Sequence, residues 1–500
     1  MESTSNNTVD HTIITFNRGD PENPVNWSAW KKTFVVTVGL ICVFNSVFNT
    51  SLPSGYTEVL SVHFGIKDST QKVLPITIYQ VGFLSGSLLF APLSETYGRR
   101  PVVICSSGLL TAFILGSVFS PSWSAYLGFR FLQGTCASSA VSVTAGLYAD
   151  IFSDARARGQ ANGLFLCALS VVPNLAPLVA AYTSLPPLNW MWPLWIAFIV
   201  AAVTFIPTLF LPETYGPRIL QKRAIRIRRQ QQQSGAGAMV YAAIELQQRT
   251  WKETITIFLA RPVKMLCTEW IVGFTSLFLG FATGIYYLFF RSYSIIFSGV
   301  YGLEQGPALI PLLPVALGSL IGFFLCCVYD HYLNRARGLG KAWALNEEYR
   351  RLPVACVGGP LCVAGLFWLG WTASASFRPE VPAASGIIFG LGFYFILAAL
   401  NNYLADAYRI HSASALAAVS FTRSVGGGTL ILAADSLYNR LHVAWGTSLL
   451  GFVMLALSAV PFVFIRYGQT MRAHSKICQQ IAKDYNSYEF SNRTAGAYQV

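Results

Sequence analysis

The sequence predicts an all-α membrane protein with twelve transmembrane helices in two six-helix halves and with both termini in the cytosol. This prediction rests on composition, on the length of the apolar segments and on the distribution of positive charge. Of the 500 residues, 53% are hydrophobic and 11% are charged, whereas about a quarter of the residues of a soluble domain are charged. The composition therefore excludes a soluble enzyme of this length.

Twelve apolar segments are long enough to span a membrane. An α-helix needs roughly 20 apolar residues to cross about 30 Å of hydrocarbon, and it satisfies its own backbone hydrogen bonds there. The predicted spans are residues 34–54, 73–93, 101–120, 123–148, 161–182, 192–211, 266–290, 307–328, 353–373, 383–404, 412–433 and 443–466.

A basic and polar gap from Glu213 to Arg261 separates the first six spans from the last six. Such a break in the middle of the chain indicates two halves joined by a linker. The expected parts are an N-terminal arm (1–33), a first half (34–212), a basic linker (213–261), a second half (262–466) and a tail (467–500), of which the arm, the linker and the tail are cytosolic.

Positive charge is unevenly distributed along the chain, which has a net charge of +13 from 35 Lys and Arg and 22 Asp and Glu. With the amino terminus in the cytosol, the outer loops carry Lys67, Lys72, Arg291, Arg378 and Arg440. The remaining basic residues fall mostly in cytosolic segments, so the positive-inside rule places both termini in the cytosol. The basic charge thus reflects topology and attraction to anionic lipid, and it does not indicate nucleic-acid binding.

The linker contains a run of basic residues, then glutamines, then a Ser-Gly-Ala-Gly segment. This pattern predicts a basic surface helix followed by a flexible connector. Two interpretations are open: the linker is a solvated connector, or it binds anionic lipid of the inner leaflet in a regulatory role.

The turn after the second span, residues 91–100, has the sequence Ala-Pro-Leu-Ser-Glu-Thr-Tyr-Gly-Arg-Arg. It resembles the G-x-L-x-D-x-x-G-R-R signature of the major facilitator superfamily, in the form typical of fungal twelve-span drug:proton antiporters. The resemblance implies the major facilitator fold, in which two halves rock about a central cavity to give alternating access. Further segments similar to the same fungal branch are residues 20–27, 130–134, 211–215, 348–353, 402–408 and 412–418.

The resemblance also implies that Glu95, Gly98, Arg99 and Arg100 form a cytosolic latch with Asp150 at the end of the fourth span. A carboxylate accepts hydrogen bonds from a helix N-terminus, and guanidinium groups pair with acids. Such a latch would hold the two halves together while the cavity opens outward. The alternative is that these charges only anchor a cytosolic loop.

Arg130 lies about a third of the way into the fourth span. An unpaired charge in hydrocarbon costs about 2.5 to 3.5 kcal/mol on insertion scales, so this side chain is expected to face protein or water. In the family, the matching arginine is linked to proton coupling. The alternative role is a structural donor to carbonyl groups of a neighbouring helix.

Polar side chains within the spans are candidates for a substrate cavity. Because Asn45 and Asn49 are four residues apart, they share one helical face. As a set, these amides and one phenol suit a neutral or cationic organic molecule, although each also suits a hydrogen bond between helices. The candidates are Asn45, Asn49, Gln80, Gln133, Asn174, Tyr286, Asn401 and Asn402.

Three segments depart from the family pattern. Alanine and valine replace glycines of the fifth span, while Pro173 and Pro177 remain. Arg291 stands where relatives have an acid, and it is expected either to select anionic substrates at the outer end or to lie among lipid headgroups. Arg423 precedes three glycines at 426–428, which allow either a close helix crossing or a hinge.

We expect secondary active export of a small organic molecule, such as a drug, toxin or secondary metabolite, by proton antiport. Proton-driven transport needs no ATP-binding site, and the chain has no G-x-x-x-x-G-K-[ST] segment. Histidines and cysteines show no metal-site spacing. We therefore expect no cofactor, no metal and no enzymatic activity, in a monomer of the plasma membrane rather than the vacuolar membrane.

Two other functions are open at this point. Proton-coupled uptake of a nutrient or polyamine would use the same fold and the same Arg130, whereas a receptor or scaffold would not need Arg130 or the latch. The sequence offers no obvious proton carrier, because the candidate acids lie toward the ends of spans. They are Glu58, Asp150, Glu269, Asp330, Asp406 and Asp435.

Overall fold

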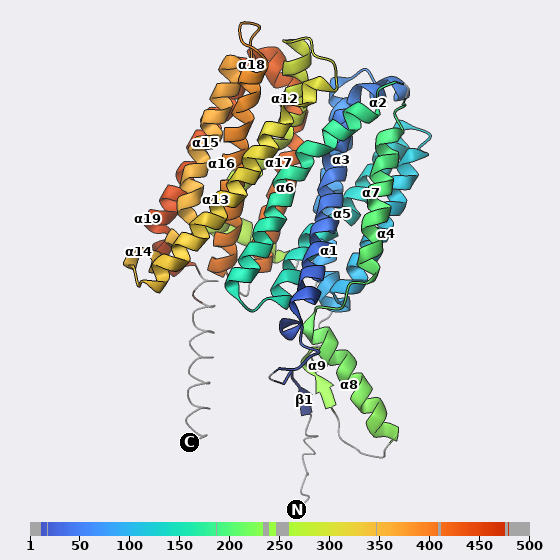
Figure 1. Cartoon of the computed structure of the whole chain (residues 1–500), viewed down its shortest axis with the longest axis vertical. Coiled ribbons are helices and arrows are strands. Elements are labelled where there is room, and N and C mark those ends of the chain that lie inside the picture. Colours follow the sequence, from blue (N-terminus) through green and yellow to red (C-terminus); the bar gives the residue numbers. More distant parts are fainter. Residues whose placement is uncertain are drawn as a thin grey trace, which may run out of the picture.

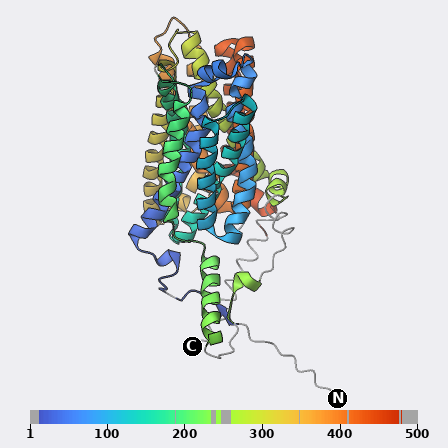
Figure 2. The same cartoon turned by 90° about the vertical axis from the view of Figure 1, so that its right-hand side faces the viewer.

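The computed structural model describes residues 12–17, 19–186, 188–233, 240–246, 260–346, 348–408, 412–475 and 479. The predicted flexible connector and most of the predicted tail lie outside these residues. The long helices run side by side as one bundle, and a small unit projects from one end (Figures 1 and 2). We call that end the near end, and we call the opposite end, where α2 (Thr57–Phe64) lies, the far end.

The bundle consists of two sets of helices. The first half contains α1 (Ala29–Ser51), η2 (Leu52–Gly55), α2, α3 (Ser69–Tyr97), α4 (Arg99–Val118), α5 (Trp123–Ile151), α6 (Ala155–Thr183) and α7 (Trp192–Leu209). The second half contains α11 (Arg261–Thr268), α12 (Trp270–Tyr293), η4 (Ser294–Ser298), η5 (Pro307–Leu309), α13 (Leu312–Gly338), α14 (Ala342–Leu345), α15 (Glu348–Thr372), α16 (Glu380–Tyr408), α17 (Ser412–Leu430), η7 (Ile431–Ala433), α18 (Ala434–Leu457) and α19 (Ala459–His474).

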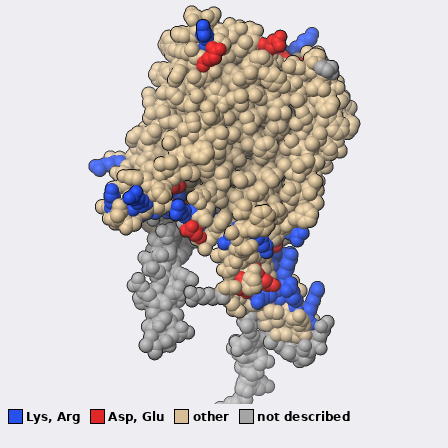
Figure 3. All heavy atoms as spheres, viewed as in Figure 1, with Lys and Arg blue, Asp and Glu red and all other residues tan. Residues whose placement is uncertain are grey.

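The prediction of a helical membrane bundle is confirmed. Ten segments of the described chain are long and apolar enough to cross a membrane, and the last of them covers α17, α18 and α19. The 29-residue α5 is not among the ten, because polar side chains lower its mean hydropathy. Two of these, Arg130 and Gln133, are each 1% exposed and therefore face protein. On the face shown in Figure 3, charged residues gather at the two ends of the bundle.

The two halves repeat the same helix pairings. In the first half α3 packs on α5, α1 on α6, and α4 on α7. In the second half α13 packs on α16, α12 on α17, and α15 on α18. The halves meet along two seams, where α3 lies against α17 and α6 lies against α13.

The fifth predicted span corresponds to α6, which continues through both of its prolines. Pro177 has no N–H to donate, so the carbonyl of Pro173, four residues earlier, loses its helical partner. The Ser51 hydroxyl donates to that carbonyl at 2.7 Å. Ala180 stands where the family pattern has a glycine, and its side chain is fully buried. The backbone of Gly55 in η2 lies close to it. The substituted segment is therefore tightly packed against η2.

The N-terminal arm and the linker form the small unit at the near end. The predicted basic helix is α8 (Gly216–Gln233), and it projects away from the bundle (Figure 1). Strand β1 (Thr12–Ile14) pairs in parallel with β2 (Val240–Ala242), which precedes α9 (Ala243–Leu246). The sequence patterns did not predict these short strands. The linker is thus packed against the arm rather than being only a connector.

Ion pairs hold α8 to the arm, which also contains η1 (Pro24–Asn26). Arg223 lies 2.5 Å from the Asp20 carboxylate, and this hydrogen bond holds the pKa of Asp20 below its ordinary value. Arg226 lies 3.5 Å from Glu22. Part of the basic charge that the sequence suggested for lipid is therefore neutralised within the protein.

The three glycines of α17 form a close crossing rather than a break. α17 continues through them, and a Cβ added to Gly426 would lie 2.1 Å from the Gly280 carbonyl oxygen on α12. No side chain fits at that distance, so glycine is required for this contact between backbones. Gly427 and Gly428 instead face Gln80 of α3 in the other half.

Gly426→Ala is expected to lower the thermal stability of the purified protein in detergent. The added methyl group must force α17 away from α12, and overpacking of this kind costs about 1–3 kcal/mol. Gly128→Ala is the matched control, because a Cβ at Gly128 on α5 meets nothing within 4 Å. Equal unfolding midpoints for the two variants would contradict the close crossing.

Candidate functional site

A small cavity lies between the two halves at the middle of the bundle. Its volume is about 40 Å³, and it is lined by α1, α3, α5 and α6 of the first half and by α12, α16 and α17 of the second. Two of the predicted cavity residues, Gln80 and Tyr286, line it. Arg423 lines it as well, although no sequence pattern indicated a site role for this residue. We call this the central cavity.

A larger cavity of about 250 Å³ opens toward the near end. It lies between α6 of the first half and α13, α15 and α16 of the second, and the predicted residue Asn402 lines it. We call it the near-end cavity. Phe393 and Tyr394 are consecutive on α16 and line the central and the near-end cavity, respectively. Both cavities thus lie along the interface between the halves, next to the same turn of α16.

The other predicted cavity residues make contacts within the protein. Asn49 donates to the Asn45 side chain one turn earlier at 2.8 Å, and Asn401 donates to the Leu397 carbonyl at 2.7 Å. Asn174 donates to the Tyr286 hydroxyl at 2.7 Å, and that hydroxyl is 2.8 Å from the Ser170 carbonyl. Tyr286 therefore links α12 to α6 beside the central cavity.

Arg130 connects three helices of the first half. Its Nε donates to the Pro75 carbonyl of α3 at 3.1 Å, and one Nη donates to the Thr50 carbonyl of α1 at 3.2 Å. The other Nη donates to Gln133, whose amide in turn bonds to α4. The guanidinium also lies 4.5 Å above the Tyr79 ring. The guanidinium N–H groups of Arg130 thus donate to neutral oxygen atoms. This is the arrangement expected of an arginine that acts as a structural hydrogen-bond donor.

The predicted latch residues meet at the near end of the first half. Arg99 Nε lies 3.3 Å from Asp150, at the ends of α4 and α5. Arg100 donates to the Leu209 carbonyl at 3.3 Å. Gly98 has a φ of +101°, which favours glycine, and Glu95 lies on the last turn of α3. These contacts lie within one half, so in this conformation they organise the first half rather than join it to the second.

Sequence reasoning missed Glu213, which completes this cluster. Its carboxylate accepts from the backbone N–H groups of Arg99 at 2.9 Å and Arg100 at 3.3 Å, which are the first amides of α4. A carboxylate at a helix N-terminus is favoured by the helix dipole. A Cβ at Gly98 would lie 2.4 Å from this carboxylate, so the glycine makes room for it. Glu213 belongs to the segment 211–215, which resembles the fungal branch. That resemblance was the one sequence signal that pointed to Glu213.

The second half contains a matching cluster. Arg351, at the start of α15, lies 3.1 Å from Asp330 of α13 and 3.5 Å from Asp406 of α16. In the second half α15 packs on α16, as α4 packs on α5 in the first half. The ion pair of Arg351 with Asp406 is therefore the counterpart of the ion pair of Arg99 with Asp150. The paired arginines at 350 and 351 carried this signal in the sequence. The cluster lies at the near-end cavity.

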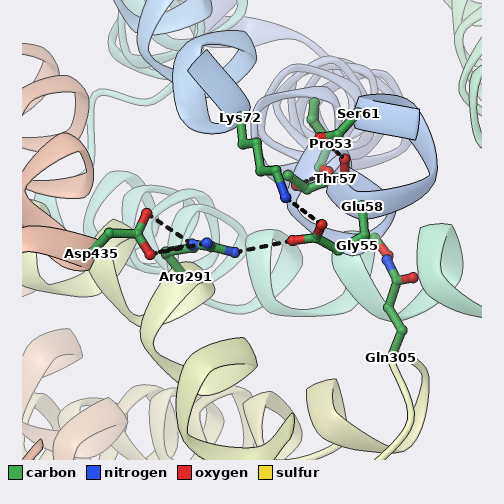
Figure 4. Close-up of polar contacts among 9 residues, drawn as sticks. All are labelled: Pro53, Gly55, Thr57, Glu58, Ser61, Lys72, Arg291, Gln305 and Asp435. Carbon is green, nitrogen blue, oxygen red and sulfur yellow. Dashed lines mark hydrogen bonds and ion pairs between the residues drawn. The ribbon is translucent and has the colours of Figure 1, made fainter. Parts of the chain in front are cut away.

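Charged and polar contacts tie the two halves together at the far end (Figure 4). Arg291 of α12 lies 3.0 Å from Asp435 of its own half and 3.6 Å from Glu58 of the other half. Lys72 lies 2.5 Å from Glu58. Gln305 donates to the Gly55 carbonyl across the interface at 2.7 Å. We call these contacts the far-end seal.

The far-end seal corrects the two interpretations of Arg291. This side chain is neither a free cation for substrate nor a headgroup contact, because two carboxylates engage it. Sequence patterns cannot reveal this pairing, since Glu58 and Asp435 are remote from Arg291 along the chain.

Among the described residues, no three His, Cys, Asp or Glu side chains are placed to hold a metal ion. The site therefore consists of two cavities, closed at the far end.

Curated relatives match nearly the whole chain. The transporter paaT of Penicillium rubens is 33% identical over 94% of this chain and 84% of its own length. The multidrug transporter FLU1 of Candida albicans is 32% identical over 91% and 74%. The citrinin biosynthesis cluster transporter mrr1 of Monascus ruber is 32% identical over 91% and 90%.

The fold is that of a solved transporter. The proton:xylose symporter XylE of E. coli superposes with a TM-score of 0.64 at 15% identity, over 88% of this chain and 96% of its own. The family model for the Major Facilitator Superfamily matches residues 36–431. With this match, these relatives and two repeated helical halves around a central cavity, the chain belongs to the major facilitator superfamily and groups with fungal multidrug and secondary-metabolite transporters.

Proposed function

We propose that this protein exports a small organic molecule by proton antiport with alternating access. The observation that carries the proposal is the asymmetry of the interface: charged and polar contacts join the halves at the far end, and a cavity of about 250 Å³ between the halves opens toward the near end. Such an arrangement is expected of one state of a transporter whose halves rock about a site near the bilayer midplane. The other state would break the far-end seal and close the near-end cavity.

The proposed topology has twelve spans and a cytosolic near end. At 1.5 Å per residue, the segment from Ser414 to His474 is about 90 Å long, far more than one crossing requires. If this segment is counted as two spans and α5 is added to the nine other segments, the total is twelve. The basic α8 lies at the near end, which suits the positive-inside rule. In this topology the arm (1–33), the linker (213–261) and the tail (467–500) are cytosolic. The two six-helix halves are then residues 34–212 and 262–466.

Export is favoured over uptake by the relatives, which include a protein named as a multidrug transporter and one named for citrinin biosynthesis. A proton falling through about 100 mV supplies roughly 2.3 kcal/mol. That free energy sustains about a fifty-fold gradient of a neutral cargo. A monomer in the plasma membrane, working without a cofactor, is sufficient for this function.

We further propose that Arg130 couples protons to the rocking of the halves and that the near-end arginine clusters act as the latch. Arg130 bonds the ends of α1 and α3, which carry part of the interface, so a change in its contacts would reach the seam between α3 and α17. Arg99 and Asp150 would meet the second half only after the near end closes.

The direction of transport is tested in a pump-deficient yeast that expresses the chain. We expect lower accumulation of labelled hydrophobic compounds than in an empty-vector strain, and a protonophore should restore accumulation because it removes the driving force. Higher accumulation that the protonophore abolishes would contradict export and establish uptake.

Arg130→Lys is expected to reduce proton-driven transport by roughly tenfold or more. Lysine keeps the charge but cannot reach three acceptors at once with a planar fork, and a lost hydrogen bond to a charged group costs about 1.5–3 kcal/mol. Transport is measured in inverted vesicles at matched protein levels. Arg440→Lys, at an exposed position, is the control. Full transport with an unchanged pH profile in Arg130→Lys would reject a coupling role.

Glu58→Gln is expected to loosen the far-end seal, because Arg291 then has no charged partner in the other half. Glu58 is half exposed, so the effect is modest: about 0–1 kcal/mol for such a pair, or up to about fivefold in the open population. The readout is alkylation of Ser54→Cys, in a background without native cysteines, by a membrane-impermeant thiol reagent. Glu304→Gln is the matched far-end control. Equal alkylation rates would show that the pair does not contribute to the seal.

A further inference from the structure

We propose that Arg423 makes the central cavity a binding site for the carboxylate of an aromatic organic acid. This inference rests on the proposed transport function and adds the chemical class of the cargo. It departs from the neutral or cationic molecule that the amides alone suggested. Four observations support it: the contacts of Arg423, the size of the central cavity, its aromatic walls and the net charge of the neighbouring near-end cavity.

The contacts of Arg423 differ from those of three other arginines in the bundle. Arg291 and Arg351 pair with carboxylates, and Arg130 donates to three neutral acceptors. Within the described part of the chain, Arg423 has one hydrogen-bond partner, Thr283 of α12, whose hydroxyl lies 3.3 Å from Nε. No described carboxylate lies within ion-pair distance of it. Its terminal nitrogens are therefore available to a ligand.

A charge at this depth is costly unless it is paired or used. Arg423 lies in the central part of α17, and it lines a cavity that both halves enclose. Arginine presents two parallel N–H groups that match the two oxygens of a carboxylate. A bound organic anion would therefore supply the partner that the protein itself does not provide.

The central cavity has the size and walls for such a group. A volume of about 40 Å³ is several times the minimum for one water, which is room for a carboxylate. Gly427 lies one helical turn from Arg423, and its missing Cβ keeps the space beside Tyr287 open. Phe393 stacks on Tyr286 with ring centroids 4.6 Å apart. Flat aromatic walls beside a cation favour an aromatic body attached to the carboxylate.

The near-end cavity, which neighbours the central cavity along the interface, has an excess of positive charge. It is lined by four arginines and two aspartates, together with one histidine. A net positive charge in a cleft raises the local concentration of anions. An organic anion would thus be attracted from the near end and held at Arg423. The charged lining residues are Asp154, Arg156, Asp330, His331, Arg337, Arg350 and Arg351.

Binding is tested on the full-length protein in detergent by thermal unfolding and by equilibrium binding at pH 7. The probes are benzoate and 2-naphthoate, each compared with its neutral amide of the same shape. We expect both carboxylates to bind at least tenfold more tightly than benzamide and 2-naphthamide. Carboxylates that bind no better than their amides would overturn the proposal without any mutant being needed.

Two variants at the same position separate charge from shape. Arg423→Gln is expected to remove the carboxylate preference, whereas Arg423→Lys should keep part of it because the positive charge remains. Arg440→Gln, which removes an exposed arginine outside both cavities, should bind like the unmodified protein. An undiminished preference in Arg423→Gln would also overturn the proposal.

Transport distinguishes this inference from the proposed function. Carboxylate-selective binding without any protonophore-sensitive movement of benzoate in cells would reject proton-driven export but leave the site standing. Protonophore-sensitive export of neutral compounds, together with equal binding of acids and amides, would reject the anion site and leave the transport function standing.

Discussion

The structure depends on one constraint: a polar group inside the bundle must find its partner within the protein, because hydrocarbon supplies none. Arg130 satisfies this constraint by donating to carbonyl groups of α1 and α3. The Ser51 hydroxyl donates to the Pro173 carbonyl, which has no helical partner because Pro177 lacks an N–H. These bonds cross between helices of the same half. These contacts tie the helices of the first half to one another.

Among the described residues, polar contacts that cross the interface between the halves lie beside the two cavities, at Tyr286 and Tyr394, and toward the far end. Toward the far end Thr77 donates to the Gly428 carbonyl at 3.0 Å, and the far-end seal lies beyond it. At the near end the arginine clusters remain within their own halves. The interface is consequently joined by an ion pair at the far end and hollow toward the near end. Rocking would exchange these two sets of contacts, which is the physical content of alternating access.

The helical bundle and the place of Arg130 follow from the sequence, because apolar length and the cost of a buried charge are local properties. The charged partners do not follow in the same way. Arg291 looked like a free outer cation until Glu58 and Asp435, which are far away in the chain, were placed beside it. Glu213 was assigned to the linker, yet it caps α4. Pairing between remote segments depends on tertiary packing, which a local pattern does not specify.

The candidate cavity residues show the same limit. Their polarity within apolar spans identified Gln80 and Tyr286, but it could not separate them from Asn45 and Asn49, which bond to each other. Arg423 was visible in the sequence only as a charge near three glycines. Its meaning came from what surrounds it: aromatic walls, a space between the halves and no described carboxylate. If its cargo is an anion, outward movement of that anion and inward movement of a proton are both driven by a potential that is negative inside.

The most direct test of alternating access is a distance measurement across the far-end seal by pulsed electron paramagnetic resonance. Spin labels at Val62 and Phe377, exposed on opposite halves at the far end, report opening there, and labels at Thr96 and Leu339 report the near end. Alternating access predicts two populations whose far-end and near-end distances change in opposite directions when pH or cargo is varied. A single fixed distance at both ends under all conditions would contradict it.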